Sequence, residues 1–235
     1  MIYSFTKSCK VFQPKLSIPD SLQIGLLWLT LITTGIAQPF PAYEADIRAF
    51  EKQDFLNPPP RNGIVFTGSS SIRLWNDIQS DFPGKPVIQR GFGGSELADV
   101  IRYADRVIIR YRPKQVIVYA GENDIATAKL SAQQVFERFQ TLFEHVRKSL
   151  PRTDFVYISI KPSPSRRTYQ PIVREANALI RDYLHTQKRA TFVDVYTPML
   201  DAQGRMRGEL FTADSLHMNR KGYALWAEIL RRVVK

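Results

Sequence analysis

Five short apolar segments constrain the fold of this chain more than any other feature of its sequence. Each is rich in β-branched residues and nearly continuous in apolar character, as strands that are covered on both faces require. The five segments are residues 63–67 (GIVFT), 86–90 (PVIQR), 115–120 (QVIVYA), 155–160 (FVYISI) and 191–195 (TFVDV). We therefore predict five buried strands.

Amphipathic helical patterns lie between these segments. Ser131 and Gln134 have the spacing of a capping box, apolar residues then recur at helical spacing, and Pro151 ends the pattern. A second helix is predicted over residues 168–185, and the last one begins near Asn219. Alternating strands and helices are typical of a three-layer α/β/α sandwich with a parallel sheet. The sequence shows no internal repeat or low-complexity linker, which favours a single catalytic domain.

The N-terminal segment has the layout of a secretory signal peptide. Residues 22–37 form an uncharged apolar run that is short for a membrane-spanning helix, follows three lysines and ends in small residues at Ala37. We therefore predict a signal peptide over residues 1–37 and a secreted or periplasmic domain over residues 38–235. A long basic region and Asp20, just before the apolar run, leave an uncleaved membrane anchor as the alternative.

The charge of the chain bears on its partners. The 235 residues carry a net charge of +11, which is compatible with peripheral contact with anionic surfaces. The Lys and Arg residues are scattered, however, and no recognition helix or aromatic-basic sheet motif accompanies them. The sequence therefore argues against a nucleic acid as partner, and it leaves the oligomeric state open.

Cysteine and histidine spacings bear on metals and cofactors. The single cysteine, Cys9, lies in the predicted leader, so the mature chain would hold none, as is compatible with an oxidising compartment. No C-x-x-C or H-E-x-x-H spacing occurs. We expect neither a metal nor another cofactor.

Four short polar or glycine-rich segments follow predicted strands. They are residues 68–71 (GSSS), 91–94 (GFGG), 121–124 (GEND) and 214–217 (DSLH), the last of them between the final strand and the final helix. Ligands of open parallel sheets bind beyond the carboxyl ends of the strands. None of these segments is specific alone, because each could be a turn or a helix cap, but their order and placement favour a shared site.

Together the four segments supply what acyl transfer requires. A serine hydroxyl needs a base such as neutral imidazole, which in turn needs a carboxylate to orient it. Backbone N–H groups at glycines and an Asn side chain can bind a developing oxyanion. Of the three histidines, only His217 has a nearby acidic residue in a motif that follows a strand; His145 is expected to be solvated, and His185 lies near a helix end.

The same four segments carry a family resemblance. The stretches VFTGSSSIRLW, RGFGG, YAGENDIA and DSLHMNRKGY resemble the motif blocks of the SGNH hydrolase superfamily, the GDSL-type esterases and lipases. The resemblance spans essentially the whole mature domain. It implies a flavodoxin-like fold with a five-stranded parallel sheet between helices, in agreement with the strand and helix pattern.

Carried over residue by residue, the resemblance implies a catalytic triad and an oxyanion hole. Ser70 would be the nucleophile, His217 its base, and Asp214 the carboxylate that orients His217. The backbone amides of Ser70 and Gly94 and the side chain of Asn123 would form the oxyanion hole. No cofactor is implied.

One position departs from the family pattern. The family usually has Asp directly before its nucleophile, where this chain has Ser69. The triad does not include this position, but the hydrogen bonding of the loop and the substrate preference stay open. The neighbours Ser69 and Ser71 are alternative nucleophiles, although Ser70 fits the motif best.

The resulting expectation is a serine esterase that cleaves a small-molecule, glycan or lipid ester through an acyl-serine intermediate. A short acyl or acetyl-glycan ester is favoured because the mature sequence shows no long apolar lid segment. A lysophospholipase-type lipase, an acyltransferase that uses the same acyl-enzyme, and a binding module without catalysis are the alternatives; the intact triad argues against the last. The sequence lacks G-x-S-x-G and a full G-x-G-x-x-G, which disfavours an α/β-hydrolase nucleophile elbow and a dinucleotide site.

Overall fold

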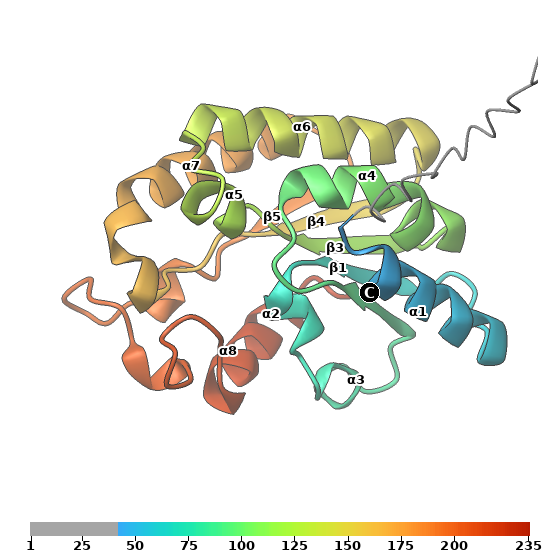
Figure 1. Ribbon diagram of the computed structural model, residues 1–235, viewed down its shortest axis with the longest axis horizontal. Helices are drawn as coiled ribbons and strands as arrows, with labels where there is room; N and C mark the ends of the chain where they lie inside the picture. Colours follow the sequence, from blue (N-terminus) through green and yellow to red (C-terminus); the bar gives the residue numbers. More distant parts are fainter. Residues whose placement is uncertain (1–41) are drawn as a thin grey trace, which may run out of the picture. The chain divides into compact units, whose positions relative to one another are not determined.

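All five predicted strands are present, each within two residues of its predicted ends. The computed structural model describes residues 42–235, so the predicted leader lies outside the described residues. The strands form one all-parallel sheet in the order β2-β1-β3-β4-β5 (Figure 1). Their bounds are Ile64–Gly68 (β1), Val87–Gly91 (β2), Gln115–Tyr119 (β3), Asp154–Ile158 (β4) and Ala190–Val193 (β5).

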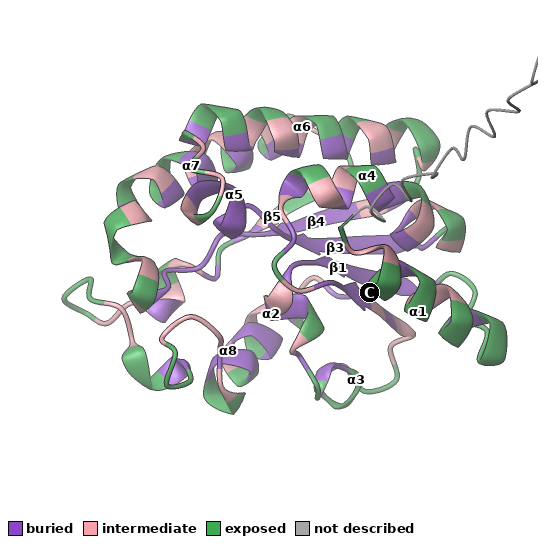
Figure 2. Ribbon diagram, in the orientation of Figure 1, coloured by how far each residue is buried: buried purple, intermediate pink, exposed green. Residues whose placement is uncertain are grey.

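Successive side chains of the central strands alternate between two hydrophobic cores, as the pleat of a strand requires. Val65 and Val116 face the core beneath helices α4 (Leu97–Val107), α6 (Ala132–Ser149) and α7 (Gln170–His185). On the opposite face, Ile64, Phe66 and Ile117 pack with the layer that includes α8 (Arg220–Leu230) and short helices α2 (Ser70–Arg73) and α3 (Ile78–Asp81). Figures 1 and 2 show the buried sheet between these two layers. The predicted three-layer α/β/α sandwich is confirmed.

Two of the three predicted helices, α6 and α8, begin at the residues that cap them. The Ser131 hydroxyl accepts the Gln134 N–H at 3.3 Å while the Gln134 side chain accepts the Ser131 N–H at 3.0 Å, so the expected capping box of α6 is present. The Asn219 side chain accepts two N–H groups of the first turn of α8. Helix α7 begins two residues later than predicted, because residues Pro164–Tyr169 form a separate 3₁₀ helix, η2.

Several helices were not predicted from the sequence. Helix α1 (Glu44–Leu56) and helix α4 each cover part of the sheet, and α2, α3 and α5 (Glu122–Ala126) are short. Further single 3₁₀ turns are η1 (Ile109–Tyr111), η3 (Thr197–Met199) and η4 (Gly208–Leu210). Within residues 42–235, no helix is both long and apolar enough to cross a membrane.

The end of β1 shows how the sheet shapes the predicted site. Gly68 has φ +124°, and a Cβ atom there would lie 1.9 Å from the carbonyl oxygen of Tyr119 on the neighbouring strand. Only glycine fits a position with both restrictions. The chain can therefore leave the sheet directly beside β3, and Ser70 begins α2 two residues later.

Candidate active site

Ser70 lies at the carboxyl end of the sheet with its hydroxyl 3.0 Å from His217 Nε2. The serines on either side are buried, with Ser69 4% and Ser71 2% exposed, whereas Ser70 is partly exposed. A nucleophile must be reachable by its substrate. The structure therefore favours Ser70 among the three adjacent serines.

Asp214 holds the other side of the His217 ring. Its Oδ2 lies 2.6 Å from His217 Nδ1, while its Oδ1 accepts the backbone N–H groups of Leu216 and His217, both at 2.9 Å, and the hydroxyl of Thr212 at 2.7 Å. Burial raises the pKa of the Asp214 carboxyl, but the hydrogen bonds from the N–H groups of His217 and Leu216 outweigh burial and hold the pKa well below its usual range. Asp214 is therefore ionised over the neutral range.

The turn that presents His217 is fixed by backbone pairing on both sides. The Thr212 N–H donates to the His217 carbonyl at 2.8 Å, and Phe211 forms an isolated antiparallel bridge with Met218. Asn219, the cap of α8, also donates to the Phe211 carbonyl at 2.9 Å. The three-residue spacing of Asp214 and His217 thus closes a tight turn in which Asp214 contacts one side of the imidazole and the other side faces Ser70.

The three expected oxyanion donors come from the ends of three adjacent strands. Ser70 is the first residue of α2, and the first N–H groups of a helix have no acceptor within the helix. Gly94, after β2, has φ +83°, which glycine adopts readily. Asn123, in α5 after β3, is 8% exposed, and its Nδ2 donates to the carbonyl of Ser95 at 3.0 Å. This last bond ties the asparagine to the glycine segment.

Asp124 has a different task from its neighbour Asn123. It is fully buried, and its carboxylate accepts the N–H of Leu97 at 2.9 Å and a guanidinium N–H of Arg138 at 2.7 Å. These bonds join α5 to α4 and α6. Asp124 thus holds the loop that carries Asn123.

His145 is solvent-exposed, as expected, but it also has an acidic partner. Its Nε2 lies 3.0 Å from Asp105 Oδ1, so a second histidine has an acidic partner 40 residues away in the sequence. Both side chains are well exposed, on α6 and α4. The pair lacks a serine in hydrogen-bond contact among the described residues, and His217 is still the histidine that contacts one.

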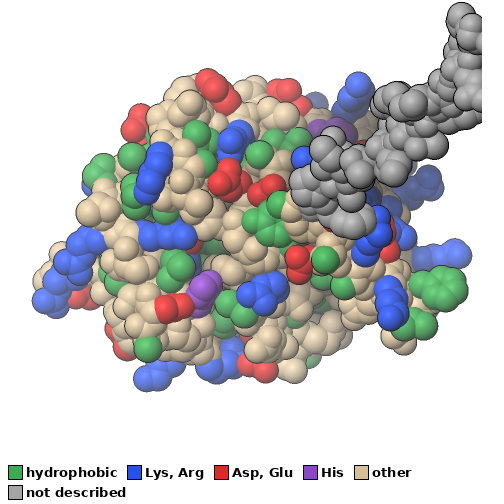
Figure 3. Space-filling view, viewed as in Figure 1, with side chains coloured by type: hydrophobic (Ala, Val, Ile, Leu, Met, Phe, Trp, Pro, Cys, Tyr) green, Lys and Arg blue, Asp and Glu red, His purple; other side chains and the backbone are tan. Residues whose placement is uncertain are grey.

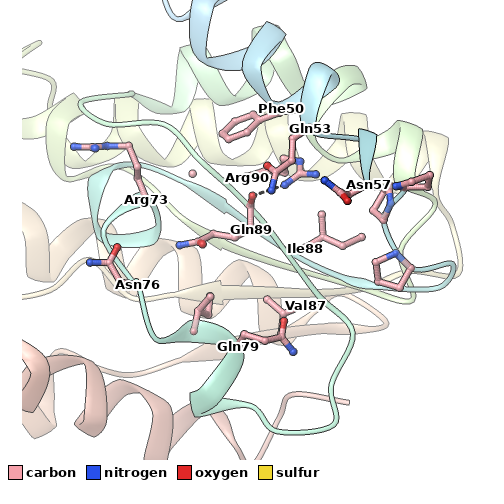
Figure 4. Close-up of a pocket in the computed structure, with 15 residues that line it drawn as sticks. Phe50, Gln53, Asn57, Arg73, Asn76, Gln79, Val87, Ile88, Gln89 and Arg90 are labelled. Carbon is pink, nitrogen blue, oxygen red and sulfur yellow. Dashed lines mark hydrogen bonds between the residues drawn. The ribbon is translucent and has the colours of Figure 1, made fainter. Parts of the chain in front are cut away.

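The visible face of the molecule is mixed in charge. Figure 3 shows Lys and Arg side chains interspersed with carboxylates over the visible face. A separate cavity of about 430 Å³ lies along β2, lined by Phe50, Gln53, Gln89 and, at one end, Arg73 of α2 (Figure 4). Its lining includes neither the Ser70–His217–Asp214 triad nor the expected oxyanion donors. Among residues 42–235, no group of three or more His, Cys, Asp or Glu side chains is arranged to hold a metal ion.

Residues 66–225 match the GDSL-like Lipase/Acylhydrolase family. The chain belongs to this family. Membership in the GDSL-like family confirms the resemblance drawn from the four motifs, and it supports hydrolysis of an ester bond as the class of activity. No curated protein matches the chain.

Solved structures share the GDSL-like fold at low sequence identity. A Streptococcus pneumonia protein whose name refers to platelet activating factor is 20% identical with a TM-score of 0.71, over 82% of this chain and 92% of the other. A GDSL-like lipase from Bacteroides thetaiotaomicron is also 20% identical, with a TM-score of 0.68 over 81% and 97%. A family 3 carbohydrate esterase from Clostridium thermocellum is 14% identical, with a TM-score of 0.57 over 75% and 100%. At these identities the likeness concerns the fold alone.

Ser69, at the departure from the GDSL-like pattern, is the N-cap of α2. Its N–H donates to the Tyr119 carbonyl at 3.0 Å, but its side chain caps no N–H group of the helix. The nucleophile loop is therefore held by backbone bonds at this position.

One residue at the site was not predicted. Arg166 donates to Asn123 Oδ1 at 2.9 Å from a segment 43 residues further along the chain. Residues 161–167 follow β4, at the edge of the sheet where the site was expected. This placement is the signal that could have drawn attention to the arginines in the segment. No local pattern could show which of them turns inward.

Proposed function

We propose that this protein is a serine esterase that cleaves carboxylic esters through an acyl-serine intermediate. The observation that carries the proposal is the unbroken hydrogen-bonded chain from Asp214 through His217 to the Ser70 hydroxyl. Family membership supports ester hydrolysis independently of this geometry. The roles of the three residues follow from their order in the chain of hydrogen bonds.

In the first half of the reaction, Ser70 Oγ attacks the ester carbonyl carbon while His217 Nε2 takes the hydroxyl proton. The ionised Asp214 carboxylate stabilises the imidazolium that forms and keeps Nδ1 as the donor toward itself. The tetrahedral intermediate then breaks the bond to the alkoxy group, which leaves as an alcohol with the proton from His217. Ser70 is left as an acyl ester.

In the second half, His217 removes a proton from a water molecule that attacks the acyl-serine carbonyl. Collapse of the second tetrahedral intermediate releases the carboxylic acid and returns the proton to Ser70. In both halves the negative oxygen would accept hydrogen bonds from the amides of Ser70 and Gly94 and from the Asn123 side chain. Donors fixed in this way stabilise the transition state more than the ground state.

A short acyl group, including acetyl on a glycan, is the substrate class that we propose. Among residues 42–235, the large apolar side chains with high exposure are Phe55 and Leu56, at the end of α1. Among the described residues, no highly exposed large apolar side chain adjoins Ser70 to receive a long acyl chain. The fold is also shared with a family 3 carbohydrate esterase.

The decisive experiment measures hydrolysis of p-nitrophenyl esters of increasing chain length by the wild type, Ser70→Ala and Ser71→Ala. We expect the acetyl ester to be the best substrate, kcat to fall at least about 10³-fold in Ser70→Ala, and Ser71→Ala to retain activity. Undiminished activity of Ser70→Ala would exclude Ser70 as nucleophile. Preference for long esters would favour the lysophospholipase alternative, and transfer to an added sugar without hydrolysis would favour the acyltransferase.

A further inference from the structure

The segment after β4 brings a guanidinium to the asparagine of the expected oxyanion hole. Arg166 Nη2 donates to Asn123 Oδ1 at 2.9 Å, and the Arg166 side chain is only 18% exposed. The neighbouring Ser165 N–H donates to the carbonyl of Ser215 at 3.0 Å, within the turn that carries Asp214 and His217. The segment therefore contacts both the expected oxyanion hole and the triad turn.

A buried polar network holds the segment after β4 in place. The Glu122 carboxylate accepts hydrogen bonds from Tyr119 Oη at 2.7 Å, from Lys161 Nζ at 2.5 Å and from the Ser163 hydroxyl. All four residues of this network are less than one-tenth exposed: Tyr119, Glu122, Lys161 and Ser163. A buried polar network whose members are all hydrogen-bonded is rigid. It therefore fixes the backbone of the segment after β4, and with it the position of Arg166 beside Asn123.

The network leaves positive charge beside Asn123. Glu122 Oε1 also lies 3.6 Å from Arg166 Nη1, so one carboxylate faces two cations. Burial raises the pKa of Glu122, but the charges of Lys161 and Arg166 outweigh burial and lower the pKa below its ordinary value. Glu122 is thus ionised, and the Arg166 guanidinium still places its charge at the Asn123 amide oxygen.

The chemistry of the guanidinium dictates which way the Asn123 amide faces. Arginine can only donate hydrogen bonds, so the atom that faces it must be the amide oxygen. The Nδ2 group then points the opposite way and donates one hydrogen to the Ser95 carbonyl. Because an amide nitrogen carries two hydrogens, a second remains for the substrate oxygen.

We propose that Arg166 is a positioning residue of the oxyanion hole: it holds the Asn123 amide with its N–H toward the substrate and polarises that N–H through the amide oxygen. This inference rests on the proposed esterase function. It adds a residue from the fourth strand end to a site that otherwise uses the ends of the first three strands and the turn before α8.

The test compares kcat and KM for p-nitrophenyl acetate in three single variants. Arg166→Met removes the hydrogen bond and the charge, Arg166→Gln keeps an amide donor without charge, and Arg167→Met alters an exposed neighbour in the same segment. Removal of one oxyanion donor typically lowers kcat about 10²–10³-fold. We expect Arg166→Met to lower kcat about 10-fold or more with KM within about twofold, Arg166→Gln to recover part of the loss, and Arg167→Met to match the wild type.

A double-mutant cycle with Asn123→Ala separates positioning from a general structural effect. If Arg166 acts through Asn123, Arg166→Met changes kcat less than about twofold once Asn123 is alanine. Independent, multiplicative losses would overturn the inference. Thermal unfolding of each variant identifies misfolding, and where Arg166→Met does not fold, the same cycle is run with Arg166→Gln.

The outcomes distinguish this inference from the function on which it rests. A wild type without esterase activity, or an active Ser70→Ala, contradicts the proposed function itself. Wild-type kcat in Arg166→Met, combined with an inactive Ser70→Ala, contradicts the role of Arg166 alone.

Discussion

Asp214 holds His217 by two independent hydrogen bonds, one to the ring and one to the backbone. Oδ2 lies 2.6 Å from Nδ1, and Oδ1 accepts the N–H of His217 at 2.9 Å. The backbone bond fixes the position of the carboxylate, and the ring bond fixes the tautomer and the direction of Nε2. The geometry of the proposed base therefore depends on one carboxylate.

Asp214→Asn should abolish most activity without unfolding the protein. A neutral amide can still occupy the site, but it cannot stabilise an imidazolium or keep the required tautomer, so kcat should fall about 10³–10⁴-fold. Asp105→Asn is the matched control, because it removes the carboxylate of the surface pair with His145. We expect wild-type kinetics in the control; equal losses in both variants would contradict the proposal.

The pH dependence of stability should report the same carboxylate. A carboxyl whose pKa is lower in the folded than in the unfolded state stabilises the fold above its unfolded pKa, near 3.9, and this contribution disappears as the pH falls through the folded value. The difference in unfolding free energy between the wild type and Asp214→Asn should therefore be largest near neutral pH and shrink below about pH 4. Because the Asp214 side chain is 47% exposed, solvent screening keeps the effect small. Denaturant unfolding at several pH values measures it, and a difference that does not change down to pH 3 would refute the assignment.

Gly94→Ala should separate backbone strain from catalysis. Gly94 has φ +83°, and the nearest atom to an added Cβ is Tyr43 Oη at 3.4 Å, so the cost is conformational, about 1–2 kcal/mol. Gly204 has φ +73° with nothing within 4 Å of an added Cβ, which makes Gly204→Ala the control. Both variants should lose similar stability in thermal unfolding, but only Gly94→Ala should also lower kcat, because it shifts a proposed oxyanion donor. A normal kcat in Gly94→Ala would remove that amide from the proposed site.

The leader is also open to direct test. We propose that export removes residues 1–37, so that N-terminal sequencing of the exported protein should begin at Gln38. A start at Met1 would contradict cleavage. Retention of the intact chain in the membrane fraction would favour the uncleaved anchor.

The positions of the strands, and of the polar segments that follow them, could be predicted from local sequence patterns. Runs such as residues 116–118 (VIV) are apolar and β-branched throughout. That pattern is typical of a buried parallel strand wherever it lies in the sheet. Since parallel strands place their carboxyl ends along one edge, the segments that contain Ser70, Gly94 and Asn123 had to meet there. The order of the four motifs along the chain also indicated the family. Helix α4 was missed although its buried residues recur at helical spacing, from Leu97 through Val100 and Ala104.

Which of several similar side chains face the site depends on how the helices and strands pack together. Ser69, Ser70 and Ser71 are alike in sequence, and it is packing against the sheet that buries the first and the third and leaves Ser70 accessible. The contact of Arg166 with Asn123 spans 43 residues and depends on a buried carboxylate, Glu122, that fixes the segment after β4. Local patterns record which face of an element is apolar. They do not record which distant polar groups meet, because that depends on how the elements pack together.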